Sequence, residues 1–197
     1  MSFLATECTF SVLDETVIKS SKLFDCGHSD LNDFFSSDCI AYSKELLGKS
    51  YCFRLDADPS IITCSFTVSN DSIKVNSLPN SRKKKLIKSI PRTKQFRSYP
   101  AVLIGRLGVN QNFKGKGIGR ELLNFIKSWF IDSNNKTGCR FLVVDAYNEP
   151  IPVKYYQSND FEYLFSSEEQ EKKYMGKQVG EALETRLMYF DLIVLSS

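Results

Sequence analysis

Residues 101–130 read AVLIGRLGVNQNFKGKGIGRELLNFIKSWF and contain the clearest structural pattern in the sequence. The apolar run Ala101–Val109 predicts a strand, and a polar turn leads from it into the glycine-rich segment Lys114–Gly119. Apolar residues at three- and four-residue spacing then predict an amphipathic helix: Ile118, Leu122, Leu123, Ile126, Trp129 and Phe130. A strand, a glycine-rich turn and a helix in this order form a cradle for an anion, and we expect a pyrophosphate there.

Three kinds of glycine-rich phosphate loop compete for this segment. A Walker loop requires Gly-Lys-Ser/Thr after its second glycine, whereas Ile118 follows Gly117. A dinucleotide fingerprint has the spacing G-x-G-x-x-G in a first strand–helix–strand unit, whereas this chain has G-x-G-x-G past its middle. A glycine-rich connection without a ligand is disfavoured by the helix that follows directly.

The third kind is the acetyl-CoA loop of the GNAT superfamily of N-acetyltransferases, Q/R-x-x-G-x-G/A. Lys114-Gly115-Lys116-Gly117-Ile118-Gly119 resembles it at every position except the first, where lysine replaces glutamine or arginine. The resemblance implies an acetyl-CoA-dependent N-acetyltransferase that acts on a primary amine. It also implies an α/β fold with a central mixed sheet flanked by helices, built as a single domain over residues 1–197.

Four weaker strings resemble the branch of this superfamily that includes bacterial type II toxins. They are Phe24-Asp25-Cys26-Gly27 with Leu31-Asn32-Asp33-Phe34, Ile104-Gly105-Arg106-Leu107-Gly108-Val109, Val144-Asp145-Ala146, and Tyr155-Tyr156 with Phe161. Two departures accompany them. Asp160 stands where the family usually has glycine, and the linker before Tyr156 is about one residue longer and contains Pro150 and Pro152.

The resemblance also implies a set of site residues. Backbone groups of Leu107, Gly108 and Val109 would contact the pantetheine arm of acetyl-CoA. The pyrophosphate would lie on the N–H groups of Lys114, Gly115, Lys116, Gly117, Ile118, Gly119 and Arg120, with Lys114, Lys116 and Arg120 adding positive charge. Tyr156 matches the tyrosine that protonates the departing thiolate, and Tyr155 is the alternative.

The stretch Ala101–Val109 contains no carboxylate to serve as a general base, and Arg106 stands there instead. This favours a substrate amine that is already reactive, such as the α-amine of an aminoacyl-tRNA, whose pKa lies well below that of a lysine side chain. Asp145 is an alternative base, although an aspartate at the end of a strand is commonly a structural hydrogen-bond partner. We expect His28 to be a loop or cap residue.

The net charge of +3 conceals an uneven distribution. Of the 26 lysines and arginines, eight lie between residues 82 and 97 without an acidic residue among them, so the rest of the chain has 18 basic against 23 acidic residues. Such a cluster is typical of a surface that binds a polyanion, here tRNA, with Lys83, Lys84, Lys85 and Arg106 as candidate contacts. A solvated lysine-rich surface is the alternative.

Composition limits the compartment and the chemistry. No apolar run is long enough to span a bilayer, and the first 15 residues lack the layout of a signal peptide, so we expect a cytoplasmic protein. Six cysteines are scattered singly and the chain has one histidine, so we expect neither a metal site nor disulfides. A homodimer and a ribbon-helix-helix antitoxin as partner are left open.

The remaining elements are predicted from periodicity and turn residues. We expect strands at Thr9–Leu13, Ser50–Leu55, Ile61–Ser69, Arg140–Tyr147, Phe161–Phe165 and Arg186–Leu195. Helices are expected over Asp30–Leu47, with Ser29 as N-cap and Gly48 as stop, in the basic segment up to a break at Pro91, and as one turn at Tyr155–Asn159. The charged segment Glu168–Lys177 is expected to be exposed.

Three other functions compete with a toxin-like enzyme. A housekeeping enzyme would acetylate a small amine or a protein, and the basic segment would then be plain surface. A binding module would keep the fold and the acyl-CoA site without activity, which the intact set Gly115, Gly117 and Gly119 argues against. A nucleic-acid-binding protein without enzymatic function would leave the glycine loop idle.

Overall fold

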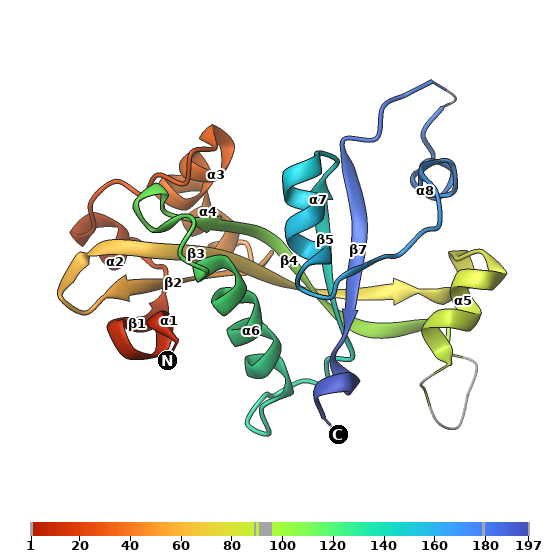
Figure 1. Cartoon of the computed structure of the whole chain (residues 1–197), viewed down its shortest axis with the longest axis horizontal. Helices are drawn as coiled ribbons and strands as arrows, with labels where there is room; N and C mark the ends of the chain where they lie inside the picture. Colours follow the sequence, from red (N-terminus) through yellow and green to blue (C-terminus); the bar gives the residue numbers. More distant parts are fainter. Residues whose placement is uncertain (1, 89, 91–95, 179, 197) are drawn as a thin grey trace. The chain divides into compact units, whose positions relative to one another are not determined.

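The computed structural model describes residues 2–88, 90, 96–178 and 180–196. Seven strands in this part of the chain form one sheet in the order β1-β2-β3-β4-β5-β7-β6, with helices beside it (Figure 1). The strands are β1 Cys8–Val12, β2 Lys49–Leu55, β3 Asp58–Lys74, β4 Ser98–Val109, β5 Phe141–Tyr147, β6 Glu162–Tyr163 and β7 Thr185–Asp191. The expected α/β fold with a helix-flanked mixed sheet is confirmed.

Eight α-helices and four shorter helical segments are present in the described residues. The α-helices are α1 Phe3–Glu7, α2 Glu15–Ser20, α3 Ser29–Asp33, α4 Cys39–Lys44, α5 Asn80–Ile87, α6 Ile118–Ile131, α7 Pro150–Gln157 and α8 Glu168–Met175. The shorter segments are the π-helical turn η1 Phe34–Asp38 and the 3₁₀ turns η2 Val75–Ser77, η3 Gln111–Phe113 and η4 Leu192–Leu195. No helix in the described ranges is both long and apolar enough to cross a membrane.

The chain divides into two compact units. The first unit comprises Met1–Ser69 and Ile104–Trp129, and the second comprises Asn70–Leu103 and Phe130–Ser197. Strands β3 and β4 and helix α6 contribute residues to both. The expectation of a single acetyltransferase domain over residues 1–197 stays a prediction.

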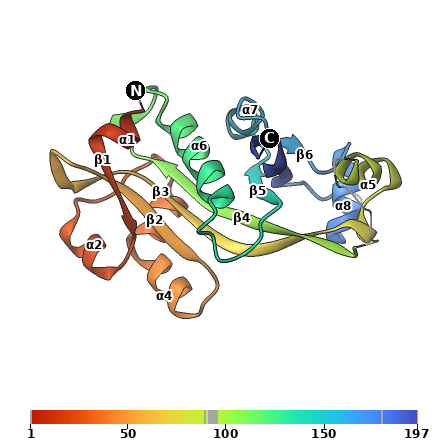
Figure 2. The same cartoon turned by 90° about the horizontal axis from the view of Figure 1, so that it is seen from below.

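In the first unit, helices cover both faces of the sheet (Figure 2): α1 and α6 lie on one face, and α2 and α4 lie on the other. The predicted apolar face of α6 is confirmed, since Ile118, Leu122, Leu123 and Ile126 are all buried. Aromatic rings join this helix to the sheet, because the ring centroid of Phe10 lies 4.8 Å from Phe125 and 5.3 Å from Trp129. Burial of such rings is a major source of stabilisation.

The predicted helix Asp30–Leu47 differs from the structure in three respects. It is divided into α3, the π-helical turn η1 and α4, and the extra residue in the wider turn lets both Phe34 and Phe35 face the core. The N-cap is His28 rather than Ser29. The helix ends at Lys44, and the backbone turns through the left-handed Leu46 (φ 58°) before Gly48 is reached.

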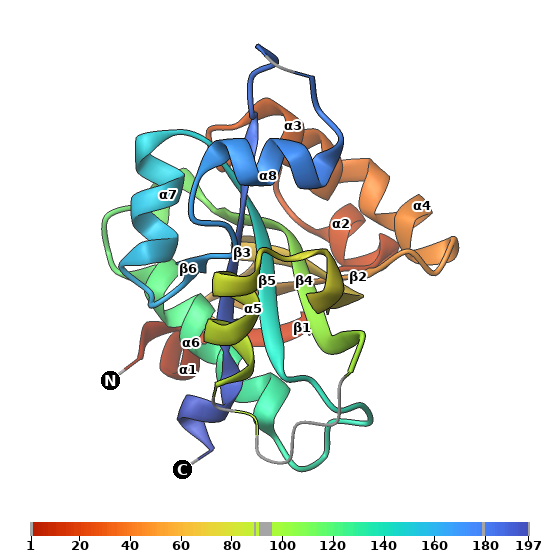
Figure 3. The ribbon, with the colours of Figure 1, turned by 90° about the vertical axis from the view of Figure 1, so that its right-hand side faces the viewer.

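In the second unit, β5 and β7 pair antiparallel from Phe141 opposite Asp191 to Tyr147 opposite Thr185, and the short β6 pairs with the other edge of β7. Helix α7 packs on β5 and α8 on β7 (Figure 3). A buried apolar cluster lies under these elements: it includes Ile73, Val75, Leu86, Tyr99, Phe141, Val143, Phe165 and Tyr189.

Several predicted boundaries move in the structure. The strand expected at Ile61–Ser69 is longer at both ends, since β3 runs from Asp58 to Lys74. The expected turn Tyr155–Asn159 is the end of a longer helix, α7, which begins at Pro150 because proline has a helical φ and needs no N–H partner in a first turn. The predicted break at Pro91 lies outside the described residues.

Three predictions near the C-terminus need correction. The strand predicted at Phe161–Phe165 is confined to Glu162–Tyr163. The last strand ends at Asp191 rather than Leu195, because the Asp191 carboxylate accepts the N–H of Ile193 and starts the turn η4. The segment Glu168–Lys177 is not uniformly exposed, since Glu171 in α8 is fully buried.

Candidate active site

The glycine-rich loop in the first unit has the backbone that its sequence predicts. Gly115 (φ 75°) and Gly117 (φ 81°) are both left-handed, a conformation that residues with a Cβ rarely adopt. A Cβ at either position would meet no other atom within 4 Å, so the loop has an open side. Helix α6 begins directly afterwards at Ile118. The loop and the helix start together fit a phosphate group.

Two of the expected backbone donors are already engaged. The N–H of Arg120 donates to the carbonyl oxygen of Gly117 at 3.0 Å as part of the first helical turn. The N–H of Lys114 donates to the carbonyl oxygen of Gln111 at 3.2 Å, which closes the turn η3. The N–H groups at both ends of the expected set therefore have partners within the chain, and the role of residues 114–120 in binding a pyrophosphate stays a prediction.

The three expected cations of the loop are held differently. The ammonium of Lys116 donates to the carbonyl oxygen of Asn112 at 3.0 Å and lies 5.3 Å from the ring centroid of Phe113, so it is drawn back over the turn. Lys114 and Arg120 are exposed. The Lys114 ammonium lies near Gly27, where an added Cβ would be only 3.2 Å from it.

Asp25, in the string Phe24–Gly27, is hydrogen-bonded to Gln111, which lies three residues before the glycine-rich loop. One carboxylate oxygen of Asp25 accepts the N–H of Gly27 and the amide of Asn32, each at 2.8 Å. The other accepts the side-chain amide of Gln111 at 2.6 Å, and the Gln111 N–H donates to the Asp25 carbonyl at 2.9 Å. These hydrogen bonds, and the nearby Lys114 ammonium, lower the pKa of Asp25.

The sequence alone indicated no role for Asp25, Asn32 and Gln111. The string around residue 25 resembles a family motif, but nothing in the sequence spacing connected residue 25 with residue 111. The link forms through tertiary structure, and it fixes the start of the phosphate loop to a turn 86 positions earlier in the chain.

Gly108 in β4 is required by close packing. A Cβ there would lie 3.2 Å from both the Cβ and the Sγ of Cys26, and 3.3 Å from the Phe24 ring. Leu107 and Val109 on either side are half-buried. The role of these three residues in contacting a pantetheine arm stays a prediction.

Arg106, also in β4, lies on an aromatic ring. Its guanidinium carbon is 4.3 Å from the ring centroid of Phe34, which belongs to the π-helical turn η1 and is 6% exposed. A cation over a ring face is attracted by the ring quadrupole, so Phe34 orients the exposed arginine. Contact of Arg106 with a substrate stays a prediction.

Tyr156 belongs to α7 in the second unit. Its ring centroid lies 5.0 Å from that of Tyr155 and 5.4 Å from that of Phe161, whose own ring packs on Phe190. Burial raises the pKa of Tyr156 above its ordinary value, because the phenolate is the form that is disfavoured in an apolar environment. The hydroxyl therefore carries its proton at neutral pH, as a general acid must.

The departure at Asp160 has a structural explanation. Asp160 is left-handed (φ 65°), which is the conformation that the family's glycine would adopt without strain. The turn still forms, since the Phe161 N–H donates to the Tyr156 carbonyl at 3.0 Å. The substitution thus leaves the end of α7 intact.

The two other titratable candidates are Asp145 and His28. Asp145 lies in β5 opposite Leu187, and partial burial, with a smaller effect of Asp71, raises its pKa. His28 is the cap residue at the start of α3, as expected for a residue in a loop. Neither finding tests a catalytic role.

The basic segment, in the second unit, is partly engaged in holding the fold. The Lys85 ammonium pairs with a Glu162 carboxylate oxygen at 2.6 Å, and its expected role in binding a substrate stays a prediction. Arg82 donates from Nε to the Leu164 carbonyl at 2.8 Å and from a terminal nitrogen to the Tyr163 carbonyl. Lys84 is exposed and Lys83 half-buried, whereas Arg92 and Lys94 lie outside the described residues.

The structure brings Arg106, Leu107–Val109 and the loop together along one strand, turn and helix of the first unit. Tyr156 and the lysines of α5 belong to the second unit. Residues 86–161 match the model of the Acetyltransferase (GNAT) family. This part of the chain, which contains β4, the glycine-rich loop, α6, β5 and α7, is similar to that family.

Solved structures give the same GNAT fold over nearly the whole chain. AtaT complexed with acetyl-methionyl-tRNAfMet has a TM-score of 0.69 and 20% identity, and covers 96% of this chain and 98% of AtaT. A tyrosine-to-phenylalanine mutant of KacT has a TM-score of 0.69 and 19% identity, covering 97% and 98%. AtaTR bound with AcCoA has a TM-score of 0.67 and 20% identity, covering 97% and 99%.

Proposed function

We propose that this chain transfers the acetyl group of acetyl-CoA to a primary amine. The observation that carries the proposal is the loop at Gly115 and Gly117, which is left-handed at both glycines and open on one side at the start of α6. The matching fold of AtaTR, solved with AcCoA, supports the same ligand class. Residues 115–119 would hold the pyrophosphate, and Lys114 and Arg120 would add charge.

Few protein groups are needed for the reaction. Acetyl-CoA supplies an acetyl group activated as a thioester. The backbone of Leu107–Val109 would orient the pantetheine arm beside the acceptor amine. Tyr156 would hold its proton at Oη for the departing sulfur as the carbon–sulfur bond breaks, while the amine nitrogen loses one proton to water. KacT and AtaT have each been solved as a tyrosine-to-phenylalanine mutant, and Tyr156→Phe is the same kind of change in this chain.

Calorimetric titration of acetyl-CoA into the protein tests the cofactor. We expect micromolar binding to the wild-type chain and none to Gly117→Glu, because a side chain there strains the left-handed backbone and adds a negative charge to the phosphate site. Gly138→Glu is the matched control, since Gly138 also has open space around its Cα but does not belong to the loop. Absence of binding to the wild type would end the enzyme proposal.

For the acceptor, we favour the α-amine of an aminoacyl-tRNA. The structure of AtaT with acetyl-methionyl-tRNAfMet shows a similar fold with a product of this class. In this chain, Arg106 is oriented by Phe34 on the strand where a carboxylate base is absent, which suits an amine that is easily deprotonated. Lys83 and Lys84 on α5 would contact the tRNA backbone.

Binding of charged tRNA at increasing salt tests this acceptor. We expect affinity to fall steeply with salt, and the slope of log K against log salt to become smaller by roughly one for each tRNA phosphate that a variant no longer neutralises. The double variant Lys83→Ala with Lys84→Ala should weaken binding, whereas Lys85→Ala should change it little because that ammonium is paired with Glu162. Unchanged binding in the double variant would remove tRNA from the proposal.

A housekeeping role remains as the second candidate, with a small amine or a protein as acceptor. It is favoured by Arg82 and Lys85, whose charges are taken up within the fold. A screen of amine acceptors distinguishes the two candidates. AtaT has also been solved with the C-terminus of the antitoxin AtaR, so we propose an antitoxin as a partner to test alongside tRNA. A non-catalytic module, a homodimer and a cytoplasmic location stay untested predictions.

A further inference from the structure

Helix α8 is anchored by a buried carboxylate. Ser167 caps the helix through its hydroxyl, which accepts the Gln170 N–H, and the Gln170 side chain accepts the Ser166 N–H in return. One turn later, Glu171 is 0% exposed. A carboxylate is costly to bury unless it is paired and hydrogen-bonded, so the partners of Glu171 determine where α8 can lie.

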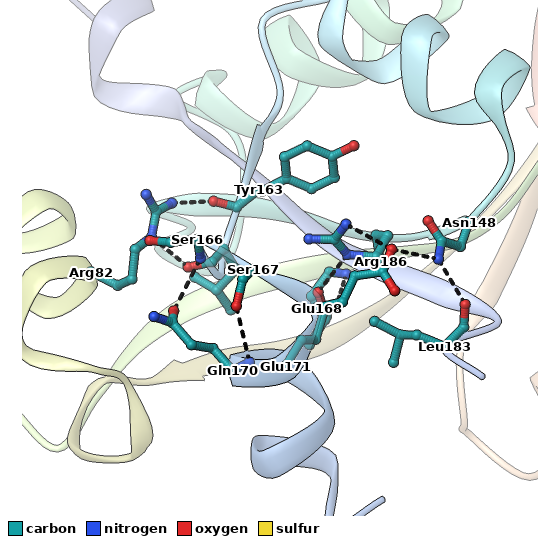
Figure 4. Close-up of polar contacts among 12 residues, drawn as sticks. Arg82, Asn148, Tyr163, Ser166, Ser167, Glu168, Gln170, Glu171, Leu183 and Arg186 are labelled. Atoms are coloured by element: carbon teal, nitrogen blue, oxygen red, sulfur yellow. Dashed lines mark hydrogen bonds and ion pairs between the residues drawn. The ribbon is translucent and has the colours of Figure 1, made fainter. Parts of the chain in front are cut away.

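These partners lie on β7. Arg186 donates from Nε to Glu171 at 2.8 Å, and the Leu187 N–H donates to the other carboxylate oxygen. The same guanidinium lies 3.6 Å from Glu168 and stacks on the Tyr163 ring at 4.3 Å (Figure 4). Arg186 therefore joins α8, β7 and β6 in one cluster.

A second connection leads from α8 to the beginning of α7. Asn148 is the residue between β5 and Glu149, the N-cap of α7. Its side-chain amide donates to Glu168 at 3.1 Å and to the Leu183 carbonyl at 2.9 Å (Figure 4). Its backbone N–H donates to the Glu184 carbonyl at 2.8 Å. The entry to α7 is thus held by Glu168 of α8 and by the main chain at residues 183 and 184, just before β7.

The other end of α7 is fixed by the same cluster. Beyond Tyr156 the chain passes through Asp160 and Phe161 into β6, and Tyr163 there lies against Arg186. The main chain of β6 is also held from the opposite side, where Arg82 binds the carbonyl oxygens of Tyr163 and Leu164. Both ends of the helix that contains Tyr156 therefore depend on contacts with the α8 segment or with Arg186.

We propose that Asn148, Glu168, Glu171 and Arg186 form a brace that positions α7, and with it the Tyr156 hydroxyl, for proton donation. They are positioning residues, since none of them is placed at the reacting atoms. The inference deepens the proposed function and rests on it. It gives the charged segment 168–177, which the sequence marks as surface, a part in catalysis.

Glu168 offers a matched pair of variants, because it is partly exposed and its loss should not prevent folding. In Glu168→Gln the side-chain oxygen can still accept from Asn148, whereas Glu168→Ala removes the acceptor. We expect kcat to fall about tenfold or more in Glu168→Ala and in Asn148→Ala, because small displacements of a proton donor are costly. Glu168→Gln should retain most of the rate.

The Michaelis constant separates positioning from general damage. The acetyl-CoA loop belongs to the other unit, so the KM for acetyl-CoA should stay within about twofold of wild type while kcat falls. Glu15→Ala, which breaks an exposed surface pair with Lys19, should leave both constants unchanged. Hydrogen exchange should show faster exchange in α7 of Glu168→Ala than in that of Glu168→Gln.

Two results would overturn the brace. One is an unchanged kcat in both Glu168→Ala and Asn148→Ala of an active enzyme, and the other is equal α7 exchange in Glu168→Ala and Glu168→Gln. Failure of the proposed function looks different, since the wild-type chain itself would then bind no acetyl-CoA and acetylate no amine. Hydrogen exchange tests the brace even in that case.

Discussion

At the scale of single residues, Tyr156 is the side chain with the clearest link between environment and chemistry. Its ring packs against the rings of Tyr155 and Phe161, and burial disfavours the phenolate. A general acid must be protonated to act, so activity is lost only as pH rises through the pKa of the donor. Raising that pKa moves the loss to more alkaline pH.

We therefore expect the alkaline limb of the kcat profile to lie above pH ~10, the ordinary pKa of tyrosine. Tyr156→Phe should lower kcat by about 10²–10⁴-fold at neutral pH, because the proton donor is absent while the ring remains. Tyr155→Phe is the control and should lose much less. An equal loss in both variants would mean that the assignment of the general acid is wrong.

Asp160 permits a stability prediction from a single φ angle. Its left-handed backbone suits glycine and costs a residue with a Cβ about 1 kcal/mol. Asp160→Gly and Asp160→Ala remove the same side-chain interactions, so the difference between them isolates the backbone term. We expect the glycine variant to be more stable than the alanine variant by about 1 kcal/mol in urea unfolding. Equal midpoints would show that the turn relaxes to another conformation.

At the scale of elements, the connection between Asp25 and Gln111 ties an early turn to the phosphate loop. Asp25→Ala removes the acceptor for Gly27, Asn32 and Gln111 at once. We expect acetyl-CoA to bind about tenfold more weakly, since a loop that must be ordered on binding costs affinity. Asp33→Ala, an exposed neighbour on α3, is the matched control for calorimetry. Wild-type affinity in Asp25→Ala would mean that the loop orders itself.

The elements show which kinds of sequence information were sufficient. Three- and four-residue spacing located α6 because the helix buries one apolar face, and apolar runs located the flanking strands because consecutive residues are buried in them, as from Phe141 to Val144 in β5. It failed between residues 29 and 47, since a π-helical turn breaks the 3.6-residue repeat. It also missed the burial of Glu171, because the charge of a glutamate does not reveal an arginine 15 positions later in the chain.

The candidate site was predictable in the same uneven way. Glycines at 115 and 117 could be recognised because their left-handed backbone leaves few other residue types. The sequence did not reveal the internal partners of Lys114, Arg120 and Lys85, because sequence spacing does not show which group will take up a donor or a cation. The backbone conformation of a loop depends on its own residues, whereas the hydrogen-bond partner of a polar group depends on which residues the fold brings near it.

At the scale of the whole molecule, the pKa shifts of several carboxylates indicate how the stability of the fold depends on pH. Hydrogen bonds from Lys22 and Ser60 lower the pKa of Asp58 to about 2, and the pKa values of Glu15, Asp25, Glu121, Glu162 and Glu169 are lowered as well. A group whose pKa is lower in the folded than in the unfolded chain stabilises the fold above its unfolded value, and this is lost as pH falls. Burial acts in the opposite direction on Asp145 and Glu171.

More carboxylates have a lowered pKa than a raised one, so we expect the melting temperature to fall as pH drops from about 5 to about 2. Asp58→Asn should flatten the lower part of this curve, because the substituted side chain no longer titrates. Calorimetric scans of the wild type and of Asp58→Asn at closely spaced pH values measure the effect. A melting temperature that rises on acidification would show that the buried carboxylates dominate.

Some residues of the basic segment have partners within the fold and others are exposed, and this difference affects which positions can change during evolution. Replacement of Arg82 would leave two carbonyl oxygens without their donor, and replacement of Lys85 would remove the cation beside Glu162, whatever the acceptor is. Lys84 is exposed and can change without that cost. Related enzymes with a different acceptor should therefore keep the residues at positions 82 and 85 and vary at positions 83 and 84. A comparison of these four positions on α5 would then show where the acceptor has changed.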